Sequence, residues 1–274
     1  MDLATIIGLI GAVIVVIVVM IMDGGKPSDL FVHPSAILIT AVGAMLATMI
    51  TTSLTTVIKL PTLVLKALVS GKSNEHELIE LLVKMADRAR RDGLLALEED
   101  SKKISDKFLQ KGIMMVVDGV DPGQVRSILE INIQQMQSRH RSGYSFFSAA
   151  GGFAPTFGII GTVMGLIAVL QSLDDPDKLA KSIAGAFLAT LWGLLSANLM
   201  FLPIGAKLKT RSDEEAHMRY MLLEGILAIQ AGENPRIVRE KLNAYLPPSA
   251  VKGDEEKATG KTAKKAAASK EVGA

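Results

Sequence analysis

Four long segments of the chain carry no charged side chain, and they form two pairs on either side of a charged block. Residues 3–22, 34–58, 142–173 and 182–206 contain no Asp, Glu, Lys, Arg or His. A helix of about 20 apolar residues crosses the ~30 Å hydrocarbon core of a bilayer. The pattern therefore predicts two membrane spans, a polar block, two more spans and a polar tail.

The apolar segments are expected to be helical, because a backbone in lipid must satisfy its own hydrogen bonds. We predict an all-α membrane protein with four transmembrane helices and a helical cytoplasmic domain between the second and third. The predicted parts are a first transmembrane pair in residues 1–58 (spans 3–22 and 34–58), a cytoplasmic domain in 59–141, a second pair in 142–206 (spans 149–173 and 182–206), C-terminal helices in 207–246 and a disordered basic tail in 247–274.

Basic residues are concentrated in the central block and after the last span. Of the 30 Lys and Arg residues, 14 fall in residues 59–141 and 13 follow residue 206. By the positive-inside rule, the central block, the tail and both termini are expected in the cytoplasm. The first segment lacks the basic start and small-residue cleavage site of a signal peptide, so we interpret it as a retained helix.

The polar regions have helical periodicity with clear start and stop signals. Asn74 and Glu77 predict a capping box at the start of a helix that ends at Asp92 and Gly93. A second helix is expected at 94–110, with Gly112 after it. Further helices are expected from Pro122, over residues 213–230, and from Pro235 to about residue 245.

Composition excludes most enzymatic chemistry. The chain has no cysteine, and its four histidines lie far apart in the sequence and match no metal-site spacing. No nucleophile-elbow or phosphate-loop motif occurs. Aromatic residues are 4% of the chain, too few for a base-stacking surface. We therefore expect no enzyme activity, no cofactor and no nucleic-acid partner.

The third and fourth spans carry small residues at helical spacing. Such faces permit close helix approach in membranes, and a tight bundle is the simplest interpretation. The glycines assigned to helix packing are Gly158, Gly161, Gly165, Gly185 and Gly193.

Hydroxyls and prolines lie on the same two spans. Thr162 and Thr190 are mid-span; such residues usually bond to their own backbone, but their oxygens could instead line an ion path. Pro155 and Pro203 each remove a helical hydrogen bond, which gives either a static bend or a hinge.

Like charges are grouped around the predicted turn at Asp92. Arg90 and Arg91 precede it, and Glu98 and Glu99 follow it. Such a cluster is usually a solvated face. Grouped rather than interleaved charges are also suited to electrostatic docking of a partner.

Together these segments resemble the MotA/PomA family of bacterial flagellar stator proteins. The resemblance extends from the first span to about residue 246 and is carried by the four-span layout and by residues 90–98, 154–165 and 186–207. It implies a cation channel in the inner membrane that turns the flagellar rotor for motility. The implied partners are a single-span, peptidoglycan-binding MotB/PomB-type protein, the rotor protein FliG, membrane lipid and further copies of the chain in a pentamer.

The resemblance also implies residue roles. Arg90 and Glu98 match the pair that engages the rotor, with Arg91 and Glu99 as helpers. The matched prolines, Pro155 and Pro203, couple ion passage to movement, and Thr162 and Thr190 match positions near the ion path. Threonine at both positions favours Na⁺ over H⁺.

Two other functions remain open at this point. An ion-driven energiser of the ExbB/TolQ type is related, but those proteins have three spans and an external N-terminus. A membrane scaffold that conducts no ions is the third interpretation.

Overall fold

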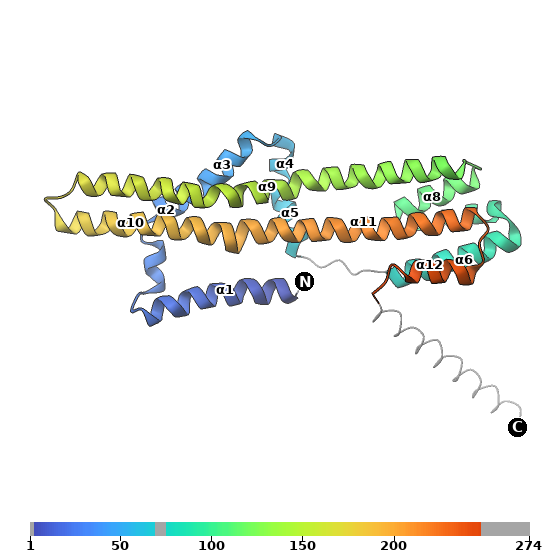
Figure 1. Cartoon of the computed structure of the whole chain (residues 1–274), viewed down its shortest axis with the longest axis horizontal. Coiled ribbons are helices and arrows are strands. Elements are labelled where there is room, and N and C mark those ends of the chain that lie inside the picture. Colours follow the sequence, from blue (N-terminus) through green and yellow to red (C-terminus); the bar gives the residue numbers. More distant parts are fainter. Residues whose placement is uncertain (1–2, 69–74, 248–274) are drawn as a thin grey trace, which may run out of the picture. The chain divides into compact units, whose positions relative to one another are not determined.

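The computed structural model describes residues 3–68 and 75–247, and every regular element in those residues is a helix (Figure 1). The chain divides into two compact units, one of residues 1–71 and 136–213 and the other of residues 72–135 and 214–274. The long helices α9 and α11 contribute residues to both units. Asn74 and residues 248–274 of the predicted tail lie outside the described residues.

In the first unit, α1 spans Leu3–Met22, as the charge-free segment predicts. A continuous helical segment then begins at Pro34, with α2 (Pro34–Ile37), the π-helical segment η2 (Leu38–Val42) and α3 (Gly43–Ile50). Proline at this first helical position loses no hydrogen bond. The short 3₁₀ helix η1 (Pro27–Phe31) lies in the preceding connection.

The charge-free segment 34–58 is not one helix. After α3 the chain turns at residues 51–53, and the short helices α4 (Leu54–Ile58) and α5 (Leu60–Leu68) follow. Hydroxyl side chains compete with the helix here: Thr51 and Thr52 both donate to the carbonyl of Thr48, each at 3.0 Å. The prediction of one span rested on the absence of charged residues, and that pattern does not show where hydroxyl groups bond to the backbone.

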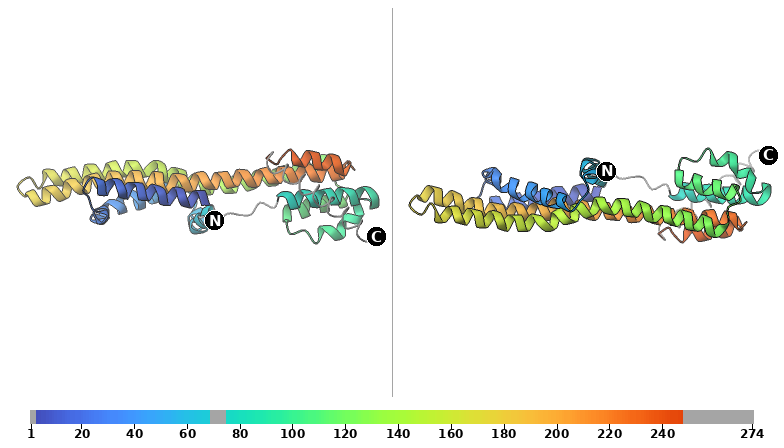
Figure 2. Two further views of the ribbon diagram at one scale, coloured as in Figure 1. Left: turned by 90° about the horizontal axis from the view of Figure 1, so that it is seen from below. Right: turned by 90° about the horizontal axis from the view of Figure 1, so that it is seen from above.

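The largest elements of the first unit form an antiparallel helical hairpin (Figures 1 and 2). One arm is the part of α9 (Pro122–Leu170) that follows residue 136, and the other is α10 (Pro176–Leu195) with the π-helical segment η4 (Ser196–Phe201). Among the residues that the structure describes, two helices, 122–170 and 176–230, are long and apolar enough to cross a membrane. Shorter apolar helices cover residues 6–22 and 34–50.

The second unit is a small helical domain with an apolar core. It contains α6 (Glu75–Asp92), η3 (Leu94–Leu97), α7 (Glu98–Ser101), α8 (Lys107–Val117), α12 (Pro235–Asn243) and the polar ends of α9 and α11 (Leu202–Gln230). α12 packs against α6. The largest fully buried side chains of this core include Ile79, Leu82, Leu109, Ile113, Leu129, Leu222 and Ile226.

Several predicted boundaries of the second unit are confirmed. α6 ends at Asp92 and is followed by Gly93 at φ +83°, a conformation that favours glycine. α9 begins at Pro122. Asn234 caps α12 by accepting a hydrogen bond from the Arg236 backbone N–H at 3.0 Å.

The prediction of one helix over residues 94–110 is wrong. The segment breaks between Ser101 and Lys107, and Asp106 starts α8 by accepting a hydrogen bond from the Leu109 N–H at 2.8 Å. Gly112 lies inside α8 instead of ending a helix, and its missing side chain leaves room for Ile226. The capping chemistry of Asp106 outweighs the apolar periodicity on which the prediction depended.

An exposed ion pair joins α6 to α12 in the second unit. Arg239 donates to both carboxylate oxygens of Glu80, with Nη2 at 3.0 Å from Oε2. The hydrogen bond from Arg239 is the main cause that lowers the pKa of Glu80 below its ordinary value of 4.5. The pair therefore stabilises the folded unit fully above pH 4.5, and the stabilisation is lost as pH falls through the lowered pKa.

We predict that Glu80→Gln removes this part of the acid dependence of stability. At neutral pH the loss should be about 0.5 kcal/mol, since both side chains are 44% exposed. The measurement is thermal unfolding of the purified chain between pH 3 and pH 7. Glu77→Gln, which removes a carboxylate from the same helix, is the control; equal pH profiles for the two variants would contradict the prediction.

Candidate functional site

Two threonines from different helices meet in the helical hairpin of the first unit. The hydroxyls of Thr162 on α9 and Thr190 on α10 are hydrogen-bonded to each other, and both side chains are half-buried. Thr162 Oγ1 also lies 3.0 Å from the Gly158 carbonyl and 3.1 Å from the Ala186 carbonyl. The structure thus brings together the two hydroxyls singled out in the sequence.

The chemistry of the groups limits the direction of these hydrogen bonds. Carbonyl oxygens only accept, so in its contacts with the Gly158 and Ala186 carbonyls the Thr162 hydroxyl is the donor, and its single proton serves one of them at a time. When it is so directed, the Thr190 hydroxyl donates to the Thr162 oxygen; in the bond between the two hydroxyls, either one can be the donor. Thr162 therefore bonds to its own helix, as is usual, and also across the hairpin.

The absence of side chains at two glycines lets the helices approach this closely. A methyl group on Gly158 would lie 3.3 Å from Gly193 Cα and 3.0 Å from the Ala189 carbonyl oxygen. A methyl group on Gly193 would lie 2.8 Å from the Ala154 carbonyl oxygen. These neighbours are backbone atoms, so they cannot move aside without separating the helices.

The remaining glycines assigned to packing behave in two ways. Methyl groups on Gly161 and Gly165 would each lie 2.7 Å from the Cβ of a facing alanine, Ala189 or Ala186. Gly185 instead faces the ring of His33, with Nδ1 at 3.3 Å from the position of a Cβ. Gly185 therefore packs against the connection between α1 and α2 rather than against α9.

Trp192 is a structural anchor that the sequence analysis missed. Its indole N–H donates to the Leu30 carbonyl at 2.8 Å, and its ring lies 5.6 Å from that of Phe31. It therefore attaches the α1–α2 connection to α10. A single tryptophan in an otherwise apolar span is the signal that could have revealed it, because a buried indole N–H needs an acceptor.

The two prolines occupy different helical environments. Pro155 lies inside α9, which continues through it from Pro122 to Leu170. Pro203 is the second residue of α11, and α11 directly follows the π-helical segment η4. A π segment changes the backbone hydrogen-bond register and is frequent at functional sites in helices.

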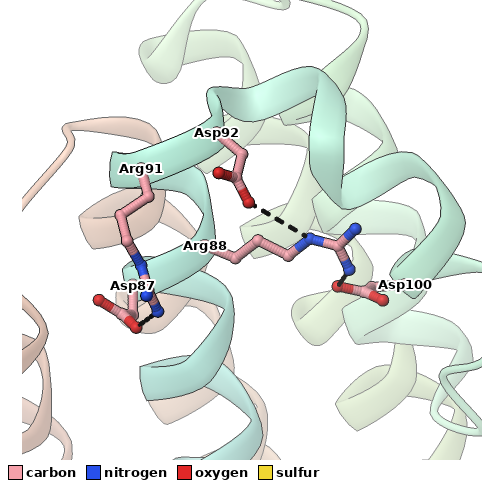
Figure 3. Close-up of polar contacts among 5 residues, drawn as sticks. All are labelled: Asp87, Arg88, Arg91, Asp92 and Asp100. Atoms are coloured by element: carbon pink, nitrogen blue, oxygen red, sulfur yellow. Dashed lines mark hydrogen bonds and ion pairs between the residues drawn. The ribbon is translucent and has the colours of Figure 1, made fainter.

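The charged cluster of the second unit is divided between structural and solvent-facing residues (Figure 3). Arg88 Nη1 donates to Asp100 Oδ2 at 2.5 Å, which joins α6 to α7, and Arg88 Nε lies 3.9 Å from Asp92 Oδ2. Arg91 pairs with Asp87 one turn earlier on α6. Arg88 and Asp100 therefore hold the turn that carries the acidic side of the cluster.

Three predicted docking residues differ in their pairing. Arg90 and Glu99 are exposed and have no ion-pair partner within residues 3–68 and 75–247. Glu98 Oε1 accepts a hydrogen bond from Lys102 Nζ at 2.9 Å. This bond lowers the pKa of Glu98 and raises the pKa of Lys102, so both are charged at neutral pH. Exposed pairs of this kind are weak, so Glu98 can exchange partners.

No group of three or more metal-ligating residues (His, Cys, Asp, Glu) occurs in the part of the chain that the structure describes. The candidate functional features are therefore the threonine pair, the prolines and the charged cluster.

Similar proteins share nearly the whole described chain. A family model described as the MotA/TolQ/ExbB proton channel family matches residues 100–221. Motility protein A of Borreliella burgdorferi is 39% identical over 214 residues, covering 78% of this chain and 82% of that protein. The chemotaxis protein PomA of Vibrio alginolyticus is 39% identical over 246 residues, covering 90% of this chain and 96% of that protein.

Two solved structures are similar to this chain in fold as well as in sequence. The C. jejuni MotAB structure matches with a TM-score of 0.86 at 34% identity, covering 90% of this chain and 97% of that one. The flagellar MotAB stator complex from Bacillus subtilis matches with a TM-score of 0.83 at 36% identity, covering 89% and 96%.

We predict that Gly158→Ala destabilises the hairpin by about 1–3 kcal/mol, because the new methyl group meets backbone atoms of α10. Thermal unfolding of the detergent-purified chain measures the change. Gly152→Ala on the same helix is the control, since nothing lies within 4 Å of its methyl position. If both variants unfold at the parental temperature, close packing at Gly158 contributes nothing to stability.

Proposed function

The chain belongs to the motility protein A family, and from this premise we propose that it is the channel-forming stator subunit of a flagellar motor. With a MotB/PomB-type partner it conducts a cation and converts the flow into torque on the rotor. The observation that carries the proposal is the hydrogen-bonded hydroxyl pair of Thr162 and Thr190 on segments without any charge. The family's description as a proton channel agrees with the expectation of a non-enzymatic protein.

Four membrane spans in the bacterial inner membrane follow from this function. Their charge-free segments are residues 3–22, 34–58, 149–173 and 182–206, with residues 59–141 and 207–246 in the cytoplasm. The second span is proposed to be shorter than its charge-free segment, because helix α3 ends at Ile50. The concentration of basic residues supports a cytoplasmic position for both termini.

The cation path includes the threonine hydroxyls but requires a carboxylate from another chain. The four charge-free segments contain no Asp or Glu, and hydroxyls alone do not neutralise a cation. We propose that the partner's single span supplies this group, and that the Thr162–Thr190 hydrogen bond opens when oxygens are needed for the ion. Threonine at both positions favours Na⁺.

Pro155 and Pro203 are proposed to couple ion passage to movement. Each lacks the N–H that would hold its helical turn, and Pro203 adjoins the π-helical η4. Prolines and π segments are the usual positions of helix kinks, which supports bending at these two places.

Arg90, Arg91, Glu98 and Glu99 are proposed to dock the rotor protein FliG. Arg90 and Glu99 are exposed, and the ion pairs of Arg91 and Glu98 are solvent-facing. Complementary charges then set the on-rate and specificity of docking. By resemblance, the assembly is a pentamer around two copies of the partner, which binds peptidoglycan.

Ion flow in the presence of the partner tests the function. The chain and the product of its partner gene should restore swimming to a strain that lacks stator subunits. Swimming speed should follow Na⁺ concentration and resist a protonophore. Speed that collapses with the protonophore would show H⁺ as the ion, and failure of both subunits together to restore swimming would contradict the stator function.

Charge reversal tests rotor docking. Arg90→Glu with Glu98→Lys should weaken docking by about 1–2 kcal/mol, roughly tenfold in affinity, and reduce torque at unchanged membrane levels. Torque on tethered cells is the measurement. The control variant, Lys111→Glu with Asp118→Lys, reverses two exposed charges of the same unit. Normal torque in the first variant would exclude this docking surface.

A further inference from the structure

Leu95 is an apolar side chain on the surface of the second unit. It belongs to η3 and is 75% exposed. Among the large apolar residues that the structure describes in this unit it is the most exposed, followed by Ile131 at 54% and Ile237 at 52%. Single exposed leucines are common on protein surfaces, so exposure alone indicates no function. What Leu95 does therefore depends on its surroundings.

The turn that carries Leu95 is held in place from both ends. Gly93 starts it at φ +83°, and Leu97, two residues after Leu95, is fully buried. η3 packs against α6, α7 and α8, and the hydrogen bond between Arg88 and Asp100 joins the helices that flank it (Figure 3). A backbone fixed in this way loses little conformational freedom when a partner binds to it.

Charged residues of opposite sign precede and follow Leu95 along the chain. Arg90 and Arg91 lie in the last turn of α6, and Glu98 and Glu99 begin α7; all four are exposed. Protein interfaces usually have an apolar centre that loses its water and a polar rim that stays partly hydrated. An exposed leucine between two groups of charges has the composition of such an interface.

The charges alone are a poor source of affinity. Exposed ion pairs contribute little to binding and are screened by salt, and their main effects are on the orientation and the rate of encounter. Burial of a leucine side chain that water had covered strengthens binding by about tenfold or more. This gain does not depend on ionic strength in the way that ion pairs do.

We propose that Leu95 is the apolar anchor of the surface that docks the rotor protein, and that it inserts into an apolar depression whose rim carries both acidic and basic side chains. The four charged residues orient the partner, and burial of Leu95 slows its release. The inference rests on the proposed rotor-docking function and adds the contact that determines the lifetime of the docked state.

Binding kinetics with FliG test the anchor. The complex of the chain and its partner is purified in detergent and passed over immobilised FliG at about 0.1 M and about 1 M NaCl. Charges are screened beyond the Debye length, which falls from about 10 Å to about 3 Å between these concentrations. Association and dissociation rates are measured separately, so the contributions of charge and of apolar burial can be told apart.

We expect Leu95→Ala to raise the dissociation rate about tenfold at both salt concentrations, with the association rate unchanged. Leu95→Met, which keeps the apolar volume, should retain most of the parental lifetime. The control is Ile237→Ala, whose native side chain is 52% exposed on α12 of the same unit, and it should bind as the parent does. Arg90→Glu with Glu98→Lys should instead lower the association rate, and only at low salt.

A parental dissociation rate for Leu95→Ala would overturn the proposal. So would an effect that disappears at high salt, because Leu95 would then act only by placing the neighbouring charges. A smaller assembly of the Leu95→Ala complex, measured by light scattering, would also overturn it and show that another copy of the chain covers this residue. A parental complex that does not bind FliG at either salt concentration would refute the docking function itself.

Discussion

The close approach of α9 and α10 at Gly158 and Gly193 is the constraint on which the membrane part of this protein depends. Backbone atoms of the two helices meet there with no side chain between them. This spacing is what allows the Thr162 hydroxyl to reach both Thr190 and the Ala186 carbonyl on the opposite helix. Larger residues at the glycines would separate the hydroxyls, and the proposed ion path would lose its paired oxygens.

Several buried hydroxyls in the apolar segments share one hydrogen-bonding arrangement. Hydroxyls at Thr40, Thr48 and Ser196 bond to their own helices, because lipid cannot satisfy them. The hydroxyls of Thr162 and Thr190 also bond within the chain, but their hydrogen bond joins two different helices. Asn198 has an exposed amide, and its Nδ2 donates a hydrogen bond to the Leu194 carbonyl of the same helical segment.

The charged cluster of the second unit shows how a surface can be both ordered and available. Arg88 and Asp100 join α6 to α7 and so hold the turn in place. Arg90 and Glu99 remain exposed, and Glu98 is held by a weak pair with Lys102. A docking surface needs such a division, because some ion pairs must position the segment while other charges stay available to the partner.

The sequence by itself determined the helical class, the four charge-free segments and most helix boundaries, including Asp92 and Pro122. It also identified the residues of the candidate site, since charge, glycine spacing and mid-span hydroxyls are visible in one dimension. It could not place the break before Asp106 or the turn after Ile50, where side-chain hydrogen bonds compete locally with the helix. Only the tertiary structure decided which glycines meet α9, that the two threonines bond to each other, and that Trp192 anchors a connection, because each depends on contacts between segments distant in the chain.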